Sequence, residues 1–184
     1  YHLGPRCLEL AHAFARNHPF ASLARPVLEA LVAETGETAH LGILRGQEVA
    51  HLDGVLPAQL LLTGSRVGER LPAHCTAIGK ALLVGVLEKP LPAPVARPES
   101  GRRRGAPNPP APGIADWTLE RFTDATITDG TKLLDEVRAS QLRGYAVDLE
   151  EYAPGLHCVA APVRDSSERV VAAISISGPG SRLG

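Results

Sequence analysis

The segment 144–178, GYAVDLEEYAPGLHCVAAPVRDSSERVVAAISISG, constrains the fold of this chain more than any other. Its β-branched and apolar runs predict strands at 145–149, 156–163 and 169–177. Ala153-Pro154-Gly155 separates the first two strands, and the polar loop Asp165-Ser166-Ser167, which has the length of a hairpin loop, joins the last two. This part of the chain therefore predicts a sheet with an antiparallel hairpin at its end.

The last predicted strand has two chemically different faces, because successive side chains point to opposite sides of a strand. Ala172, Ile174 and Ile176 share an apolar face, whereas Ser175 and Ser177 lie on the other. A strand placed centrally with two serines on one face is either solvated there or lines a cavity. This choice decides how the function is interpreted.

Helices and a second hairpin are predicted upstream of this segment. An apolar stripe (Phe20, Leu23, Val27, Leu28 and Leu31) predicts a helix over Phe20–Thr35. Strands follow at 38–44 and 47–52 around the turn Arg45-Gly46, with a third expected at Leu60–Thr63. Further helices are predicted at 77–87, capped by Thr76, and at 130–143, capped by Asp129 and ended by Gly144, with no helix after Gly178-Pro179-Gly180. Helices segregated from antiparallel strands indicate an α+β fold.

Composition narrows the class of protein. The 184 residues suit one domain, and a net charge of −1 argues against a broad nucleic-acid surface. No apolar run is long enough for a membrane helix, and the sequence contains no segment with the pattern of a signal peptide. Three widely spaced cysteines form no disulfide framework, so we expect a reducing, cytoplasmic compartment. The absence of methionine indicates a fragment of a longer protein.

Two segments stand apart from the expected core. Residues 89–115 are rich in proline and contain Arg102-Arg103-Arg104, which predicts a flexible insertion. Residues 1–18 predict an entry helix whose apolar side chains (Leu3, Cys7, Leu10 and Phe14) form either a seam to another helix or an ordinary contact with the same domain.

The start of the helix at 77–87 is one candidate binding site. The amides of Ala77, Ile78 and Gly79 carry the positive end of the helix dipole, and a small carboxylate placed there would accept several of them. The alternative is that Thr76 and water satisfy these amides.

Histidine–cysteine pairs offer a second candidate site. A zinc site from His74, Cys75, His157 and Cys158 has suitable ligand types but no close ligand spacing such as CxxC. A nucleophilic thiol at Cys75 or Cys158 is another hypothesis, although His157 cannot activate its neighbour Cys158 across a strand. Buried, unreactive cysteines are the default interpretation.

A third candidate combines Asp148 with Cys158, Ser175 and Ser177 as the floor of a binding pocket. This set has no base, nucleophile or metal site in a convincing arrangement. It indicates recognition of a ligand without catalysis and without a cofactor.

At these residues the chain resembles the effector-binding domain of IclR-type bacterial transcriptional regulators. The resemblance rests on YHLGPRCLELA, LPAHCTAIGKALL, TITD, LRGYAVDLEEYAPGLHCVAAPV and VVAAISISGP, which occur in the family's order. It implies a GAF/profilin-like curved antiparallel sheet with flanking helices, a small-molecule pocket, and dimers or tetramers in the cytoplasm. Carried over residue by residue, it implies effector-binding residues at Leu60, Thr63, Leu71, Ala77, Ile78, Asp148, Leu156, Cys158, Ser175 and Ser177.

The resemblance also implies how the chain is divided. Residues 1–18 resemble the linker helix that follows a winged helix-turn-helix, which is missing before Tyr1, and residues 19–184 the effector-binding domain. The expected function is to bind a small organic acid and so modulate DNA binding by the full-length protein, with DNA contacted only through the missing domain. A GAF-like thiol-dependent enzyme and a purely structural dimerisation module are the alternatives.

Overall fold

The computed structural model describes residues 4, 6, 7, 9, 20–58, 66–88 and 113–183. The predicted strand at Leu60–Thr63 and most of the segments 1–18 and 89–115 therefore lie outside the described residues. The elements are α2 (Phe20–Thr35), β1 (Thr38–Arg45), β2 (Glu48–Val55), β3 (Arg70–Pro72), α3 (Ala77–Glu88), the 3-10 helix η1 (Ile114–Asp116), α4 (Gly130–Arg143), β4 (Ala146–Leu149), β5 (Leu156–Arg164), β6 (Val170–Pro179) and α5 (Gly180–Leu183).

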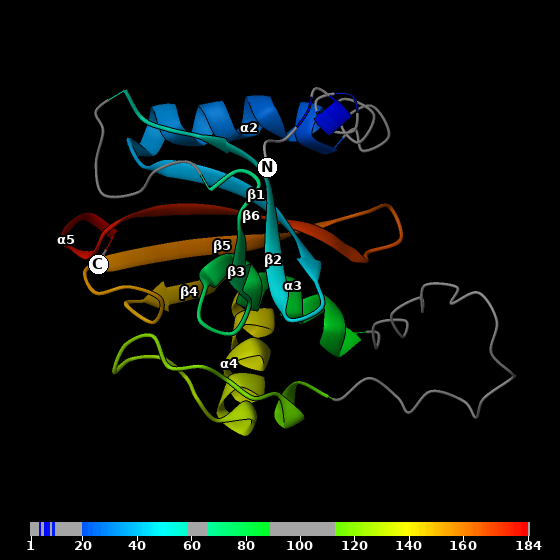
Figure 1. Cartoon of the computed structure of the whole chain (residues 1–184), viewed down its shortest axis with the longest axis vertical. Helices are drawn as coiled ribbons and strands as arrows, with labels where there is room; N and C mark the ends of the chain where they lie inside the picture. The colour runs from blue at the N-terminus through cyan, green and yellow to red at the C-terminus, as the bar shows by residue number, and fades with distance from the viewer. Residues whose placement is uncertain are drawn as a thin grey trace, which may run out of the picture.

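The strands form one curled, six-stranded sheet in the order β3-β2-β1-β6-β5-β4 (Figure 1). Every pair of neighbours is antiparallel. The two predicted hairpins supply β1–β2 and β5–β6, and β6 pairs with β1, so the two halves of the chain meet at the centre of the sheet. The α+β fold with a curved antiparallel sheet is confirmed.

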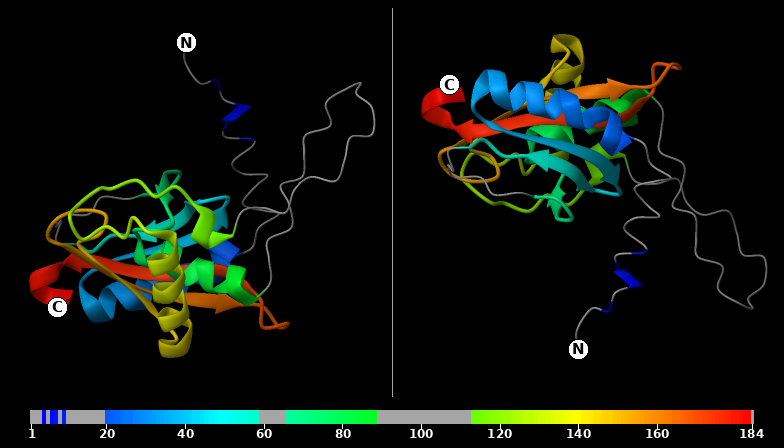
Figure 2. Two further views of the ribbon diagram at one scale, coloured as in Figure 1. Left: turned by 90° about the horizontal axis from the view of Figure 1, so that it is seen from below. Right: turned by 90° about the horizontal axis from the view of Figure 1, so that it is seen from above.

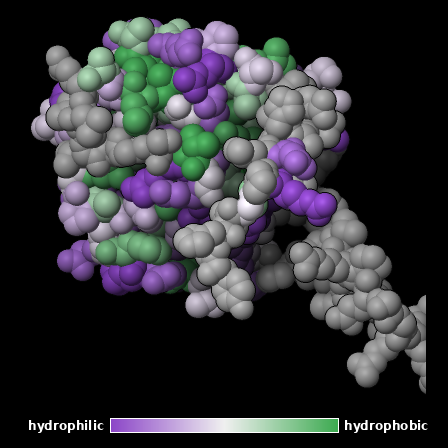
Figure 3. Space-filling model, turned by 45° about the horizontal axis from the view of Figure 1, so that its top comes forward, coloured by the Kyte–Doolittle hydropathy of each residue, from purple (hydrophilic) through white to green (hydrophobic). Residues whose placement is uncertain are grey.

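Helix α2 covers one face of this sheet (Figure 2). Its bounds match the prediction, but the predicted apolar stripe is only partly right, since Leu28 and Leu31 pack toward the sheet and Leu23 and Val27 do not. Leu28 and Val32 are buried against Ala39, Leu41 and Ala172 of the sheet. Leu23 and Val27, which were expected to pack inward, are 72% and 49% exposed. On the face shown in Figure 3, hydrophobic and hydrophilic residues are interspersed.

Helices α3 and α4 lie on the opposite side of the sheet, and they pack on each other (Figure 2). All residues of α3 from Ala77 to Val84 are buried, so this helix is the centre of the larger core. Helix α4 contributes Leu133 and Val137 to this core, with Leu134 partly buried, as predicted. Because α3 is enclosed, its first turn is held rigidly against the sheet.

The termini of the helices agree with the sequence, with one exception. Asp129 caps α4 by accepting the amide of Lys132 at 2.9 Å, and Gly144 ends it in the left-handed conformation (φ 83°). The expectation of no helix after Gly178-Pro179-Gly180 is wrong, since α5 begins at Gly180. The guanidinium of Arg182 pairs there with the buried carboxylate of Glu37.

The end of the predicted insertion is part of the core. Ile114 lies in η1 and is 4% exposed within the α3–α4 core. The carbonyl oxygen of Ala115 lies 2.3 Å from where a Cβ on Gly130 would be, so α4 begins in close contact with this segment. Among the described residues, no helix combines the length and the apolar character that crossing a bilayer requires.

Candidate functional site

A cavity lies between the start of α3 and the sheet. It contains about 440 Å³ of empty space, part of it open to solvent. Its walls are formed by His40, His51, Arg66, Leu71, Thr76, Ala77, Ile78, Asp148, Tyr152, Leu156, Cys158, Ser175 and Ser177. The structure thus brings together most of the predicted effector-binding residues, namely Leu71, Ala77, Ile78, Asp148, Leu156, Cys158, Ser175 and Ser177.

Strand register explains why residues far apart in sequence meet here. Asp148 pairs with Cys158, and Cys158 pairs with Ser177. Two residues away along β6, Ser175 pairs with His40 of β1. Directly paired residues on neighbouring strands share a face of the sheet, so these side chains form a polar band under α3.

The first turn of α3 forms the wall of the cavity that lies opposite the sheet. Thr76 donates its hydroxyl to the carbonyl of Pro72 at 2.8 Å and accepts the amide of Gly79 at 3.3 Å. Of the three amides that the sequence singled out, Thr76 therefore satisfies that of Gly79. Ala77 and Ile78 line the cavity, where the positive end of the helix dipole favours an anion.

Three predicted residues do not belong to the cavity wall as the structure describes it. Leu60 and Thr63 lie outside the described residues. Gly79 is placed against protein, because a Cβ there would lie 2.2 Å from the carbonyl oxygen of Ala73. Its lack of a side chain lets α3 approach the backbone of Ala73.

Sequence reasoning missed five residues of the wall: His40, His51, Arg66, Thr76 and Tyr152. The two histidines sit on predicted strands, where alternation separates the two faces but does not identify the buried polar one. Arg66 lies 5.8 Å from the ring centre of Tyr152, and so links the loop before β3 to the β4–β5 turn. Only the pairing of β1 with β6 would have marked His40 as a site residue.

Asp148 is the most unusual group in the cavity. It is 1% exposed, and its Oδ1 accepts the amide of Glu151 at 2.7 Å. Its Oδ2 is buried without a hydrogen-bond partner among the described residues. Burial raises the pKa of Asp148 to about 6, against the lowering effect of the hydrogen bond from Glu151. An orphaned oxygen in a cavity wall is a ready acceptor for a ligand hydroxyl or N–H group.

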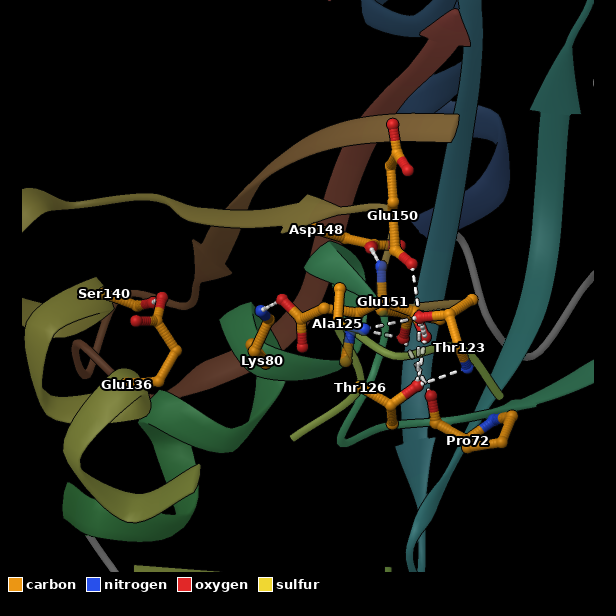
Figure 4. Close-up of polar contacts among 12 residues, drawn as sticks. Pro72, Lys80, Thr123, Ala125, Thr126, Glu136, Ser140, Asp148, Glu150 and Glu151 are labelled. Carbon is orange, nitrogen blue, oxygen red and sulfur yellow. Dashed lines mark hydrogen bonds and ion pairs between the residues drawn. The ribbon is translucent and has the colours of Figure 1, made fainter. Parts of the chain in front are cut away.

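A buried network holds Asp148 in place (Figure 4). Lys80 of α3 is fully buried and pairs with the carboxylate of Glu151. Thr126 donates its hydroxyl to the carbonyl of Glu151 at 2.6 Å, and Thr123 donates to that of Glu150 at 2.7 Å. These contacts tie the turn after β4, whose Glu151 amide binds Asp148, to α3 and to the loop before α4.

The raised pKa of Asp148 predicts a specific pH dependence. The folded chain holds this proton more tightly than the unfolded chain, so the carboxyl group lowers the free energy of unfolding as pH rises from about 4 to about 6. The loss amounts to at most about 3 kcal/mol. Asp148→Asn, which keeps an acceptor for Glu151 but cannot ionise, should raise the free energy of unfolding by about 1–3 kcal/mol at pH 7.5 and leave it nearly unchanged at pH 4.

Urea denaturation at both pH values measures this difference. The matched surface variant Asp135→Asn should change stability by less than about 0.5 kcal/mol at either pH. An Asp148→Asn variant that is equally destabilised at both pH values would show that Asp148 is ionised and well solvated in the cavity wall.

The enzyme hypothesis requires a thiol with a lowered pKa, and the two buried thiols have raised pKa values. Burial raises the pKa of Cys75 and of Cys158 to about 12, with the charge of Asp148 as the next contribution in each case. A catalytic cysteine needs a lowered pKa, because the thiolate is the nucleophile. Neither cysteine therefore fits the role of an activated nucleophile.

The zinc alternative also lacks support. His74 bonds through Nε2 to the carbonyl of Glu120 at 2.9 Å, and His157 lies 3.9 Å from the carboxylate of Glu150. Within the part of the chain that the structure describes, no three His, Cys, Asp or Glu side chains gather into a group suited to a metal ion.

Comparison with known proteins identifies the family and agrees with the fold. The family model "Bacterial transcriptional regulator IclR C-terminal" matches residues 12–91 and 113–184. The HTH-type transcriptional regulator BhcR of Paracoccus denitrificans is 37% identical over 183 residues, which make up 100% of this chain and 59% of BhcR. The chain thus spans about three fifths of that relative's length.

Solved structures give the same result. IclR of Thermotoga maritima superposes with a TM-score of 0.78 at 30% identity, over 97% of this chain and 64% of that one. The inducer-binding domain of PobR from Acinetobacter, a double mutant in complex with 3-hydroxybenzoic acid, gives a TM-score of 0.68 at 27% identity, over 89% of this chain and 85% of that one. These are transcriptional regulators and not enzymes. The chain belongs to the IclR family of bacterial transcriptional regulators, and it corresponds to their C-terminal domain.

Proposed function

We propose that this chain is the effector-binding domain of an IclR-type regulator, and that it binds a small organic acid in the cavity under α3. The observation that carries the proposal is the meeting of two features in one cavity wall. The start of α3 at Ala77 and Ile78 favours an anion, and the buried Oδ2 of Asp148 lacks a partner among the described residues. A ligand with a carboxylate and a hydroxyl group can contact both the start of α3 and Asp148.

Each part of the cavity has a proposed task. The carboxylate of the acid binds the amides of Ala77 and Ile78. Arg66, whose side chain is positively charged, lines the same cavity. Ser175 and Ser177 bind further oxygens, whereas Asp148 would repel a carboxylate and instead accepts a ligand hydroxyl. Leu71 and Leu156 cover the apolar part. Leu60 and Thr63 remain proposed contacts on the strength of the resemblance.

The role of the whole regulator follows from linkage. We propose that residues 1–18 connect this domain to a DNA-binding domain, and that 19–184 form a domain acting in the cytoplasm as a homodimer or homotetramer. Effector binding then changes DNA affinity, and DNA binding changes effector affinity by the same factor. The PobR structure, solved with 3-hydroxybenzoic acid, supports a hydroxylated acid as the type of effector.

A thermal-shift screen of small organic acids tests this proposal. An acid at about 100 times its dissociation constant stabilises the folded chain by about 2.7 kcal/mol, which raises Tm by several degrees. We expect at least one acid to raise the Tm of the unmodified chain and not that of Ser175→Ala/Ser177→Ala. The control Ser166→Ala/Ser167→Ala changes two exposed serines in the β5–β6 loop and should respond like the unmodified chain. A screen without any stabilising acid would contradict the proposal and favour the structural dimerisation module.

A further inference from the structure

The cavity has a second polar end, formed by His40 of β1 and His51 of β2. The two rings meet edge to face, with their centres 5.4 Å apart. His40 is 3% exposed and His51 is 5% exposed, so both are buried in the wall. Their polar atoms therefore require partners from protein, water or ligand.

The two histidines differ in how their polar atoms are satisfied. The Nε2 atom of His40 accepts the backbone amide of Arg66 at 3.4 Å. The ring is further fixed by Gly54, where a Cβ would lie 2.9 Å from the Cδ2 atom of His40. In contrast, the Nδ1 atom of His51 is buried without a partner among the described residues. His51 therefore presents an unused hydrogen-bonding atom in the cavity wall.

The surroundings of His51 favour a neutral ring with an acceptor at Nδ1. Burial and the charge of Arg66 lower its pKa, against the raising effects of the Glu69 charge and of a hydrogen bond to the backbone of Glu69. A neutral imidazole has one donor and one acceptor nitrogen, and Nδ1 is the ring nitrogen of His51 that lacks a partner among the described residues. We take this nitrogen as the acceptor.

One functional group cannot satisfy both orphaned atoms of the cavity. Asp148 lies on β4 and His51 on β2, which are separated in the sheet by β5, β6 and β1. Four strand spacings correspond to ~19 Å along the sheet, and curling of the sheet shortens this distance on the inner side. A ligand group bound to Asp148 therefore leaves His51 to be satisfied by another part of the ligand.

We propose that His51 is a specificity-determining residue of this site, and that the effector carries a hydroxyl or N–H group that donates to its Nδ1 atom. The inference rests on the proposed function, since it names a second recognition group in the same cavity. Such an effector is an acid with at least one donor group beyond the one that Asp148 accepts. A plain carboxylic acid of the same size leaves His51 unsatisfied and binds more weakly.

Calorimetric titration with matched acids tests this inference. The probes are pairs in which the second acid adds a donor group beyond the one that Asp148 accepts: lactate with glycerate, and each monohydroxybenzoate with its dihydroxy derivatives. For the pair that the unmodified chain discriminates best, His51→Leu should weaken binding of the hydroxylated acid about tenfold or more and change that of the parent acid less than about twofold. His51→Asn, whose amide lies near the position of Nδ1, should restore part of the discrimination.

His157→Leu is the matched control. The Nδ1 atom of His157 is also buried without a partner in the described structure, but His157 does not line the cavity. Its removal should leave the discrimination unchanged. In the unmodified chain, the Nδ1 resonance of His51 should shift on addition of the hydroxylated acid and not of its parent, which tests the contact without any substitution.

The outcomes separate the two proposals. If acids bind but His51→Leu keeps the discrimination, or weakens both members of a pair equally, the role of His51 is overturned and the proposed function stands. If no probe binds the unmodified chain, both are overturned.

Discussion

Replacing Lys80 by methionine should lower the free energy of unfolding by about 3–5 kcal/mol, although the two side chains have similar length. Lys80 is fully buried, and its amine pairs with Glu151, whose side chain is 10% exposed. The Oε2 atom of Glu151 already lacks a partner among the described residues, so the substitution leaves a buried carboxylate without any neutralising charge. The turn after β4, which contains Glu151 and holds Asp148 in place, should loosen as a result. Guanidinium denaturation measures the change.

Two further variants identify the cause of that loss. In Lys80→Met/Glu151→Leu no unpaired charge remains, so more than half of the lost stability should return. Arg138→Met removes the cation of an exposed pair with Asp135, and it should cost less than about 1 kcal/mol. A loss below about 1 kcal/mol for Lys80→Met would show that the buried pair is dispensable, and the account of the network would be wrong.

Gly79→Ala should destabilise the chain by about 2–4 kcal/mol, even though alanine is the better helix former by about 1 kcal/mol. The added Cβ would lie 2.2 Å from the carbonyl oxygen and 2.4 Å from the Cα atom of Ala73. Ala73 cannot move freely, because it is buried and its amide donates to the carbonyl of Gln47 at 2.9 Å. The start of α3 must therefore shift away from the sheet, which also moves Ala77 and Ile78 in the cavity wall.

Gly46→Ala provides the control for Gly79→Ala. Gly46 lies in the β1–β2 turn with φ 67°, and nothing lies within 4 Å of a Cβ placed there. Its substitution should cost only about 1 kcal/mol, from the left-handed backbone alone. If Gly79→Ala proves neutral or stabilising in thermal and urea denaturation, α3 does not pack on Ala73 as closely as the structure shows.

Local signals in the sequence predicted well where helices and strands lie, and predicted less well which face of a helix is buried. The ends of α4 were predicted correctly, because Asp129 and Gly144 act on the helix within one turn of its two ends. The buried face of α2 was predicted only in part, since this helix carries two overlapping apolar stripes that share Leu28 and Leu31. The sheet selects the one with Leu28 and Val32, and only the packing of α2 on the sheet decides between them.

The candidate site was likewise predicted in part from local patterns, and in part could not be predicted from them. Alternation along β6 placed Ser175 and Ser177 on one face, and the structure puts that face under α3. The contribution of β1 and β2 was not predictable in this way, because His40 reaches the site through its register with Ser175. Register between distant strands depends on the assembled core, which one sequence does not reveal. The orphaned atoms of Asp148 and His51 are likewise properties of the packed structure.

The most direct test of the central claim is an NMR titration of the ¹⁵N-labelled chain with the acid that stabilises it most in the thermal screen. The proposed binding mode predicts that the amide signals of Ala77 and Ile78 move most, because a carboxylate bound there polarises these N–H groups, with smaller changes at Ser175 and Ser177. Shifts confined to surface residues, with the signals of Ala77 and Ile78 unchanged at saturation, would contradict an effector site at the start of α3.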